Sequence, residues 1–244
     1  MYIPSYRDQG NFVAWNLGPE PGHWWNDSQF PVHNRETAWA EATRARYVEF
    51  DTVENVQLHS DVAAVAVDSG KLGDSVVLVT NSAGGIRGLL TAIKSTTQRV
   101  KALVMYEIAG SVLPDTAGVP AKQNGFGPFV VPLEDYKRLA ELEMVQFVWG
   151  DHRSPKELED VSRYVGNWTE FVENSKLASK IINELGGKSE VFFLGDDAGL
   201  KGSSHVAFMD MDNVKVANLL EGVLRKAGLA GYKKSDWWPR WRVW

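Results

Sequence analysis

The sequence predicts an α/β fold in which a mostly parallel sheet carries helices on both faces. Three observations support this prediction. Apolar runs of strand length alternate along the chain with segments of helical periodicity, a pattern typical of parallel sheets. Polar or acidic residues directly follow several of these runs, where ligands bind in such folds. The chain has 244 residues, of which 44% are hydrophobic, enough for one large domain with a core of its own.

The first 35 residues are rich in proline, glycine and aromatic residues, and we expect a loop segment there. This composition argues against long regular elements. The aromatic side chains either pack on the domain surface or line an apolar substrate pocket. Helical periodicity then runs from Arg35 to about Glu49, and a second helix is expected from Asp61 to Ser69. His59 falls between these two helices, where a structural or solvent-exposed role is expected.

The most informative stretch is a predicted buried strand, Val76–Val79, followed by a turn of small residues and by helical spacing from Ile86 to Ile93. Ser82 lies in that turn. Strand, serine and helix in this order are typical of a nucleophile elbow, usually written G-x-S-x-G. The residues two before and two after such a serine nearly touch, so both must be small. Gly84 meets this requirement, whereas Thr80 is larger than the usual glycine.

Two interpretations of Ser82 remain open from this stretch alone. Ser82 is either a catalytic nucleophile or the N-cap of an ordinary strand-to-helix turn. In the catalytic interpretation, the helix that starts at Ala83 directs its free N–H groups and the positive end of its dipole at the turn. The backbone N–H of Ala83 can then donate a hydrogen bond to an oxyanion and stabilise its charge.

The rest of the chain continues the alternation of strands and helices. Further strands are expected at Arg99–Glu107, Met144–Trp149 and Ser189–Leu194. Helices are expected at 133–142, 156–185 and Asn213–Ala227. Between them lie a long connection rich in glycine and proline, 108–132, and a loop at 195–204. Connections as long as the first are usually functional or mobile in compact domains.

A serine nucleophile needs a base, and the base needs an acid that orients it. His205 follows the last predicted strand and its loop, which makes it the candidate base. Two acids are candidates for the third position. Asp151 follows the strand that precedes the histidine's strand, and Glu107 ends the strand after the elbow helix. Each could instead accept a hydrogen bond from a loop N–H, so the residues alone leave both open.

Several blocks between about Leu17 and Leu229 match a known protein family. They are Gly18-Pro19, Asp27–Val32, the elbow, Tyr106-Glu107, Val148–His152, Ala178–Gly187, and Gly202–His205 with Asp212, Asn213, Val216 and Ala217. In these blocks the chain resembles a group of bacterial esterases of the α/β-hydrolase fold. The resemblance implies Ser82 as nucleophile, His205 as base and Glu107, after the sixth strand of that fold, as orienting acid. Asp151 then becomes a supporting residue or the alternative acid.

The chain also departs from that family. Asn81 and Ala83 flank Ser82 where the family usually has His and Gln. A longer segment that precedes the Gly18-Pro19 block in the family has no equivalent in residues 1–16. In the family this segment contains the first strands of the sheet and a His-Gly loop of the oxyanion hole. We therefore expect a shortened sheet with an open apolar edge at the Val76–Val79 strand.

The sequence thus predicts a serine hydrolase that cleaves a carboxylic ester through an acyl-enzyme, without a metal or organic cofactor. The alternative is a non-catalytic, hydrolase-like protein that lacks a complete oxyanion hole and binds an apolar ligand or partner. The chain has no cysteine, which excludes disulfides, thiol catalysis and cysteine metal sites. A net charge of −5 without a sustained basic patch argues against nucleic acid as a partner.

The ends of the chain carry further expectations. No apolar run approaches the ~18 residues of a membrane-spanning helix, and residues 1–8 lack the apolar core of a signal peptide. The cytoplasm is therefore the default compartment. A tail rich in tryptophan and arginine, 230–244, can pack on the open sheet, contact a membrane surface or mediate self-association. The expected partner is a small, apolar ester, with self-association through the open edge or the tail as a further expectation.

Overall fold

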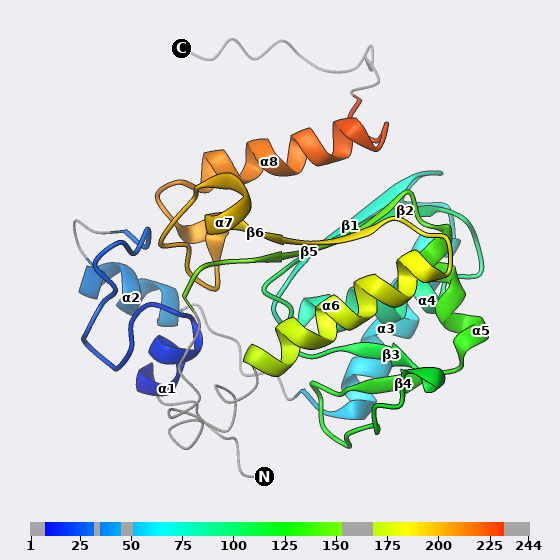
Figure 1. The fold of residues 1–244 in the computed structure, drawn as a ribbon, viewed down its shortest axis with the longest axis horizontal. Coiled ribbons are helices and arrows are strands. Elements are labelled where there is room, and N and C mark those ends of the chain that lie inside the picture. The colour runs from blue at the N-terminus through cyan, green and yellow to red at the C-terminus, as the bar shows by residue number, and fades with distance from the viewer. Residues whose placement is uncertain (1–7, 32–34, 45–50, 153–167, 232–244) are drawn as a thin grey trace.

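The structure is a computed structural model that describes residues 8–31, 35–44, 51–152 and 168–231 (Figure 1). Its main sheet consists of β1 (Val76–Asn81), β2 (Val100–Tyr106), β5 (Met144–Trp149) and β6 (Ser189–Phe193). The strands lie in the order β1-β2-β5-β6, and every neighbouring pair is parallel. Each strand corresponds to an apolar run of the sequence, so the predicted parallel sheet is confirmed.

Helices cover both faces of this sheet (Figure 1). One face carries α3 (Val53–Asp68), α4 (Gly84–Lys94) and α6 (Trp168–Glu184), and the other carries α8 (Asn213–Lys226). The smaller helices are α1 (Asp8–Ala14), α2 (Arg35–Arg44), α5 (Leu133–Tyr136) and α7 (Leu194–Ala198). The described residues also include the short 3₁₀ helices η2 (Asp115–Ala117), η3 (Lys137–Glu141) and η5 (Ala207–Met209). None of the helices in the described ranges is long and apolar enough to cross a membrane.

The central strand β2 is buried on both faces because successive side chains point to opposite sides of a sheet. Leu103 and Met105 belong to the large core on the side of α4 and α6. Val104 and Tyr106 belong to a smaller core with Val216 of α8. The part of a strand that is covered on both faces needs apolar residues at successive positions, which explains the continuous apolar run from Ala102 to Tyr106.

Two expectations about the middle of the chain are wrong. The second predicted helix begins at Val53 rather than at Asp61, since Thr52 caps it by accepting a hydrogen bond from the N–H of Asn55 at 3.2 Å. His59 therefore lies within α3 rather than between two helices. The capping residue Thr52 therefore starts α3 at Val53, although the apolar periodicity of the first turns of this helix is weak.

The connection 108–132 is also more regular than expected. Its segments β3 (Val112–Pro114) and β4 (Phe129–Val131) pair in parallel as a second, two-stranded sheet. Val112 and Leu113 are fully buried in the large core, so burial of apolar side chains stabilises this short sheet against the local glycine and proline content. The loop predicted at 195–204 likewise begins as the short helix α7.

The N-terminal segment, residues 8–31 with α2, has a small core of its own. Phe12, Leu17 and Phe30 are buried in it. Trp24 lies edge-on to Phe12 and stacks on Phe30, with ring centroids 4.7 and 5.5 Å apart. The aromatic residues of the predicted loop segment thus pack mainly against one another, around the short helix α1. The predicted tail beyond Gly231 lies outside the described residues.

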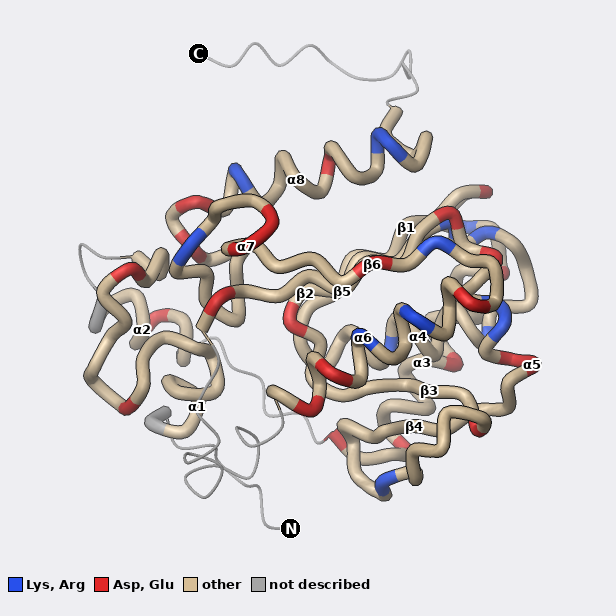
Figure 2. The backbone as a smooth tube through the Cα atoms, in the orientation of Figure 1, with Lys and Arg blue, Asp and Glu red and all other residues tan. Residues whose placement is uncertain are grey.

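The sheet ends at β1, which pairs with β2 and with no second strand in the described part of the chain. Val79 of β1 is 44% exposed. The apolar side chains of Leu58, Val62 and Val65 on helix α3 are exposed as well, at 57%, 61% and 69%. Among the described residues β1 is therefore an edge strand, as the sequence predicts. Charged residues of both signs are interspersed along the described elements (Figure 2).

Candidate active site

Ser82 lies in a sharp turn between β1 and α4, and its backbone adopts a left-handed conformation with φ of 55°. Such a conformation costs a residue other than glycine about 1–3 kcal/mol, so the surroundings must hold it in place. Three backbone hydrogen bonds do so. The N–H of Ser82 donates to the carbonyl of Tyr106 at 3.0 Å, and its own carbonyl accepts from Gly85 at 2.9 Å and Ala109 at 3.1 Å. A serine at a sharp, left-handed turn between a strand and a helix is the geometry expected for a nucleophile elbow.

Small residues allow the helix after the elbow to approach the strands closely. A Cβ on Gly84 would lie 3.5 Å from the Cβ of Thr80, which is ordinary contact, so threonine is accommodated where a glycine is usual. A Cβ on Gly85 would overlap the side chain of Ile108, and one on Gly88 would lie 3.0 Å from the methyl group of Thr80. Gly84 and Gly88 on α4 therefore make room for Thr80 on β1.

The first turn of α4 is fixed by Arg87. Its guanidinium donates to the carbonyl of Ala83 at 3.0 Å, to His59 Nδ1 at 3.1 Å and to the carboxylate of Asp51 at 2.8 Å. His59 thus has the structural role expected from the sequence. Ala83 precedes the first residue of α4, where backbone N–H groups are not used within the helix. An oxyanion at the turn would find its donor there.

Glu107 directly follows β2 and is a second buried residue with a left-handed backbone, at φ of 48°. Its N–H donates to the carbonyl of Val148 at 2.8 Å, which anchors it to the neighbouring strand. Its Oε1 accepts a hydrogen bond from the N–H of Gly150. Its Oε2 lies 3.5 Å from His205 Nδ1 and 3.5 Å from the side-chain amide nitrogen of Asn16. The carboxylate is therefore directed at the imidazole.

His205 is buried and is held through its backbone as well as its ring. Its N–H donates to the carbonyl of Trp15 at 2.9 Å, and its carbonyl accepts from the amide of Asn81 at 3.0 Å. Because Asn81 precedes Ser82, this bond ties the loop of the base to the elbow. The indole of Trp168 packs on the imidazole, with ring centroids 4.7 Å apart. Between the described side chains of Ser82 and His205 there is no hydrogen bond, a bond that in free enzymes often forms only when substrate binds.

Asp151, the alternative acid, makes a different contact. Its Oδ2 accepts a hydrogen bond from the N–H of Gly202 at 2.8 Å, and a Cβ on Gly195 would overlap its carboxylate. The structure therefore brings Glu107 to His205 and Asp151 to the backbone of the loop that carries His205. That is a supporting contact of the kind that strand-end carboxylates often make.

The N-terminal segment closes over this end of the sheet. The carboxylate of Asp27 lies 2.7 Å from His152 Nε2, and the indole of Trp25 stacks on the same imidazole with centroids 4.4 Å apart. The N–H of Gln29 donates to the carbonyl of Gly202 at 2.8 Å. Residues of the segment thus contact the loop after β5 and the loop that leads to His205.

Sequence reasoning missed a buried acid beside the base. Asp210 accepts a hydrogen bond at Oδ2 from the N–H of Ser204 at 2.7 Å, while its Oδ1 has no partner within the described chain. The pKa of Asp210 is raised to about 6, mainly by burial and to a smaller extent by the charges of Asp212 and Glu107, while the hydrogen bonds from Ser204 oppose the rise. No local sequence pattern marks this aspartate, because its burial depends on how the loop after β6 folds back.

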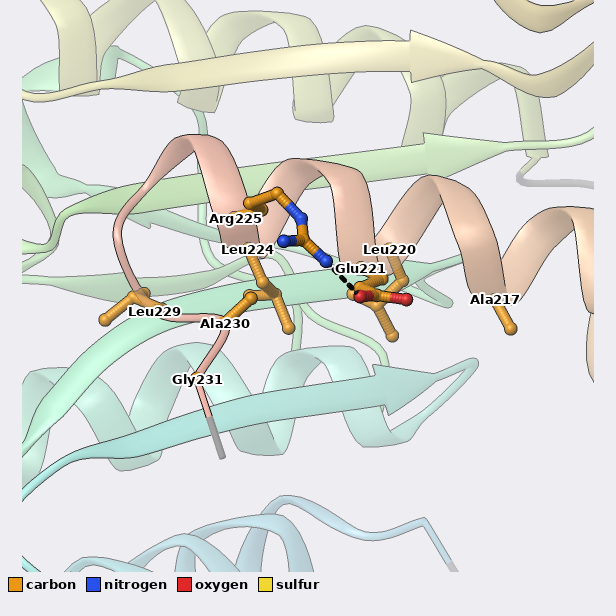
Figure 3. Close-up of a pocket in the computed structure, with 8 residues that line it drawn as sticks. All are labelled: Ala217, Leu220, Glu221, Leu224, Arg225, Leu229, Ala230 and Gly231. Atoms are coloured by element: carbon orange, nitrogen blue, oxygen red, sulfur yellow. Dashed lines mark hydrogen bonds and ion pairs between the residues drawn. The ribbon is translucent and has the colours of Figure 1, made fainter. Parts of the chain in front are cut away.

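A pocket of about 580 Å³ lies along α8 (Figure 3). It is lined by Ala217, Leu220, Glu221, Leu224, Arg225, Leu229, Ala230 and Gly231. No candidate catalytic residue lines it, so it is not the place where an ester would meet Ser82. No group of three or more histidine, aspartate or glutamate side chains in the described ranges is arranged to hold a metal ion.

The comparisons with known proteins show the fold. The chain is similar to a solved structure, the atomic-resolution structure of a novel bacterial esterase, with a TM-score of 0.65 and 22% sequence identity. The similarity covers 93% of this chain and 59% of the esterase, so the chain spans little more than half of that protein's length. No protein-family model and no curated protein matches the sequence. The fold is α/β-hydrolase-like, as the sequence predicts.

Proposed function

We propose that the protein is a serine hydrolase that cleaves carboxylic esters. The observation that supports this most directly is the buried pair of Glu107 Oε2 and His205 Nδ1, 3.5 Å apart, beside a serine in a strained elbow. An acid that faces Nδ1 keeps the proton on that nitrogen, which leaves Nε2 free to act as a base. The similarity to a bacterial esterase is consistent with this reaction class.

The reaction follows from the roles of these groups. His205 Nε2 removes the proton from Ser82 Oγ as Oγ attacks the ester carbonyl carbon, and the negative charge on the carbonyl oxygen faces the N–H of Ala83. The alcohol leaves with the proton from His205, and Ser82 carries the acyl group. Water then attacks the acyl-enzyme with His205 again as base, which releases the acid. Glu107 stabilises the imidazolium in both steps.

The oxyanion hole decides between this function and the alternative. Ala83 supplies one backbone donor, whereas acyl-transfer sites use two or more, and the loss of one donor lowers kcat about 10²–10³-fold. A protein with a single donor would be a slow esterase. A protein in which the serine does not react would be the non-catalytic binding protein that the sequence leaves as the second candidate.

A fluorophosphonate probe with an intact-mass readout tests the proposal. The probe is expected to add once to the wild-type chain and not at all to Ser82→Ala. Hydrolysis of short and medium-chain p-nitrophenyl esters is expected to disappear in the same variant. A wild-type chain that is not labelled, or a Ser82→Ala variant that is labelled equally, would contradict the proposal that Ser82 is a catalytic nucleophile.

A further inference from the structure

The N-terminal helix α1 ends in a turn that places an asparagine against the candidate acid. The N–H of Leu17 donates to the carbonyl of Phe12 at 3.2 Å, and the N–H of Asn16 donates to that of Val13 at 3.0 Å. These two bonds define a Schellman motif, in which the residue at the position of Asn16 must be left-handed. Its φ is indeed 56°. Glycine is the usual residue at this position. Among residues that carry a side chain, asparagine is one that tolerates the left-handed conformation well.

Unlike a glycine, Asn16 has a side chain at this position, and that side chain points toward Glu107. Asn16 is only 3% exposed, and its amide nitrogen lies 3.5 Å from Glu107 Oε2. That oxygen is the one that faces His205 Nδ1. The backbone carbonyl of Trp15, the residue before Asn16, accepts a hydrogen bond from the N–H of His205 at 2.9 Å. Two consecutive residues of one turn therefore hold the acid and the base of the candidate site.

We propose that Asn16 is a positioning residue for Glu107, an inference that rests on the proposed function. Glu107 Oε1 is held by the N–H of Gly150, and the amide of Asn16 holds Oε2 from the other side. A carboxylate fixed at both oxygens keeps Oε2 in line with His205 Nδ1. The N-terminal segment is thus part of the catalytic apparatus, because it completes the environment of the acid.

The experiment compares Asn16→Gly with Asn26→Gly. Both substitutions remove an asparagine side chain from the same segment, but Asn26 is exposed. Asn16→Gly is expected to lower kcat for a p-nitrophenyl ester about tenfold with little change in KM, the loss expected for one hydrogen bond to a charged group. Its melting temperature is expected to stay at the wild-type value or rise, since glycine suits the turn. Asn26→Gly is expected to keep the wild-type kcat.

Two further measurements separate positioning from a general structural effect. In a Glu107→Gln background, Asn16→Gly is expected to change the rate of ester turnover or probe labelling less than twofold, because the carboxylate through which Asn16 acts is gone. Asn16→Asp keeps the shape of the side chain but sets a carboxylate against Glu107, and it is expected to lower kcat at neutral pH at least as much as Asn16→Gly.

The proposal is overturned if Asn16→Gly keeps the wild-type kcat, or if its effect has the same size with and without Glu107. Failure of the proposed function has a different signature, in which the wild-type chain neither hydrolyses esters nor takes up the probe. The positioning contact is then read from the His205 Nδ1 proton by nuclear magnetic resonance. Faster exchange of that proton in Asn16→Gly, but not in Asn26→Gly, supports the contact, and equal exchange in both overturns it.

Discussion

Replacing Glu107 with glutamine is expected to remove nearly all ester hydrolysis, whereas replacing Asp151 with asparagine is expected to leave most of it. Both changes turn a carboxylate into an amide of the same shape. An amide at position 151 can still accept the hydrogen bond from the N–H of Gly202, now 2.8 Å long. An amide at position 107 can still accept from Gly150, but it no longer carries the charge that stabilises the imidazolium of His205.

The structure sets the size of the difference. Glu107 is 3% exposed, so bulk water does not screen its charge. Opposite charges separated by the 3.5 Å between Oε2 and His205 Nδ1 attract by about 5 kcal/mol at an effective dielectric constant of about 20. At about 1.4 kcal/mol per tenfold change in rate, Glu107→Gln is expected to lower kcat about 10³–10⁴-fold. The same range applies to triads whose orienting carboxylate becomes an amide. Asp151→Asn weakens one hydrogen bond, which corresponds to about tenfold or less.

The assay measures kcat and KM of both variants with one p-nitrophenyl ester, together with the rate of fluorophosphonate labelling and the melting temperature. The melting temperatures show whether a loss of rate reflects a loss of fold. The reverse order, with Asp151→Asn the more damaging of two folded variants, would refute the assignment of Glu107 as the acid. Equal losses in both variants would refute the argument from charge, because only one of the two carboxylates faces His205.

Two predictions concern stability and association. The pKa of Asp210 is raised from 3.8 to about 6 in the folded protein, so wild-type stability should fall by about 3 kcal/mol, relative to Asp210→Asn, as pH rises from about 3 to about 7. Urea unfolding at several pH values measures this, and parallel pH profiles for the two proteins would contradict it. We also propose that copies associate through the open edge at β1, where Val79 is 44% exposed. Val79→Lys should then lower the mass measured by light scattering at micromolar concentration, whereas Val214→Lys on α8, at a residue 68% exposed, should not. An unchanged mass in Val79→Lys would rule out this edge.

The strands and the residues that follow them could be predicted from the sequence, because short runs of apolar residues indicate where a buried strand lies and ends. A buried parallel strand favours apolar residues at nearly every position, and β2 and β5 show that pattern with a single polar residue each, Lys101 and Gln146. Ser82 directly follows β1, Glu107 directly follows β2, and Asp151 follows β5 after Gly150. The start of α3 at Val53 could not be predicted from apolar periodicity, because a single capping residue determines it. The second sheet in 108–132 could not be predicted either, because burial against a core formed by distant parts of the chain determines it.

The sequence by itself determined the fold class and the short set of residues that could do chemistry, since hydrophobic periodicity and residue type act locally. It left the acid open between Glu107 and Asp151, and only the tertiary structure shows which carboxylate faces His205 and which one faces Gly202. Asn16 and Asp210 could not be found from the sequence, because contacts between residues far apart in the chain define their roles. Asn16 meets Glu107 from 91 positions away, and no local pattern encodes a contact of that kind.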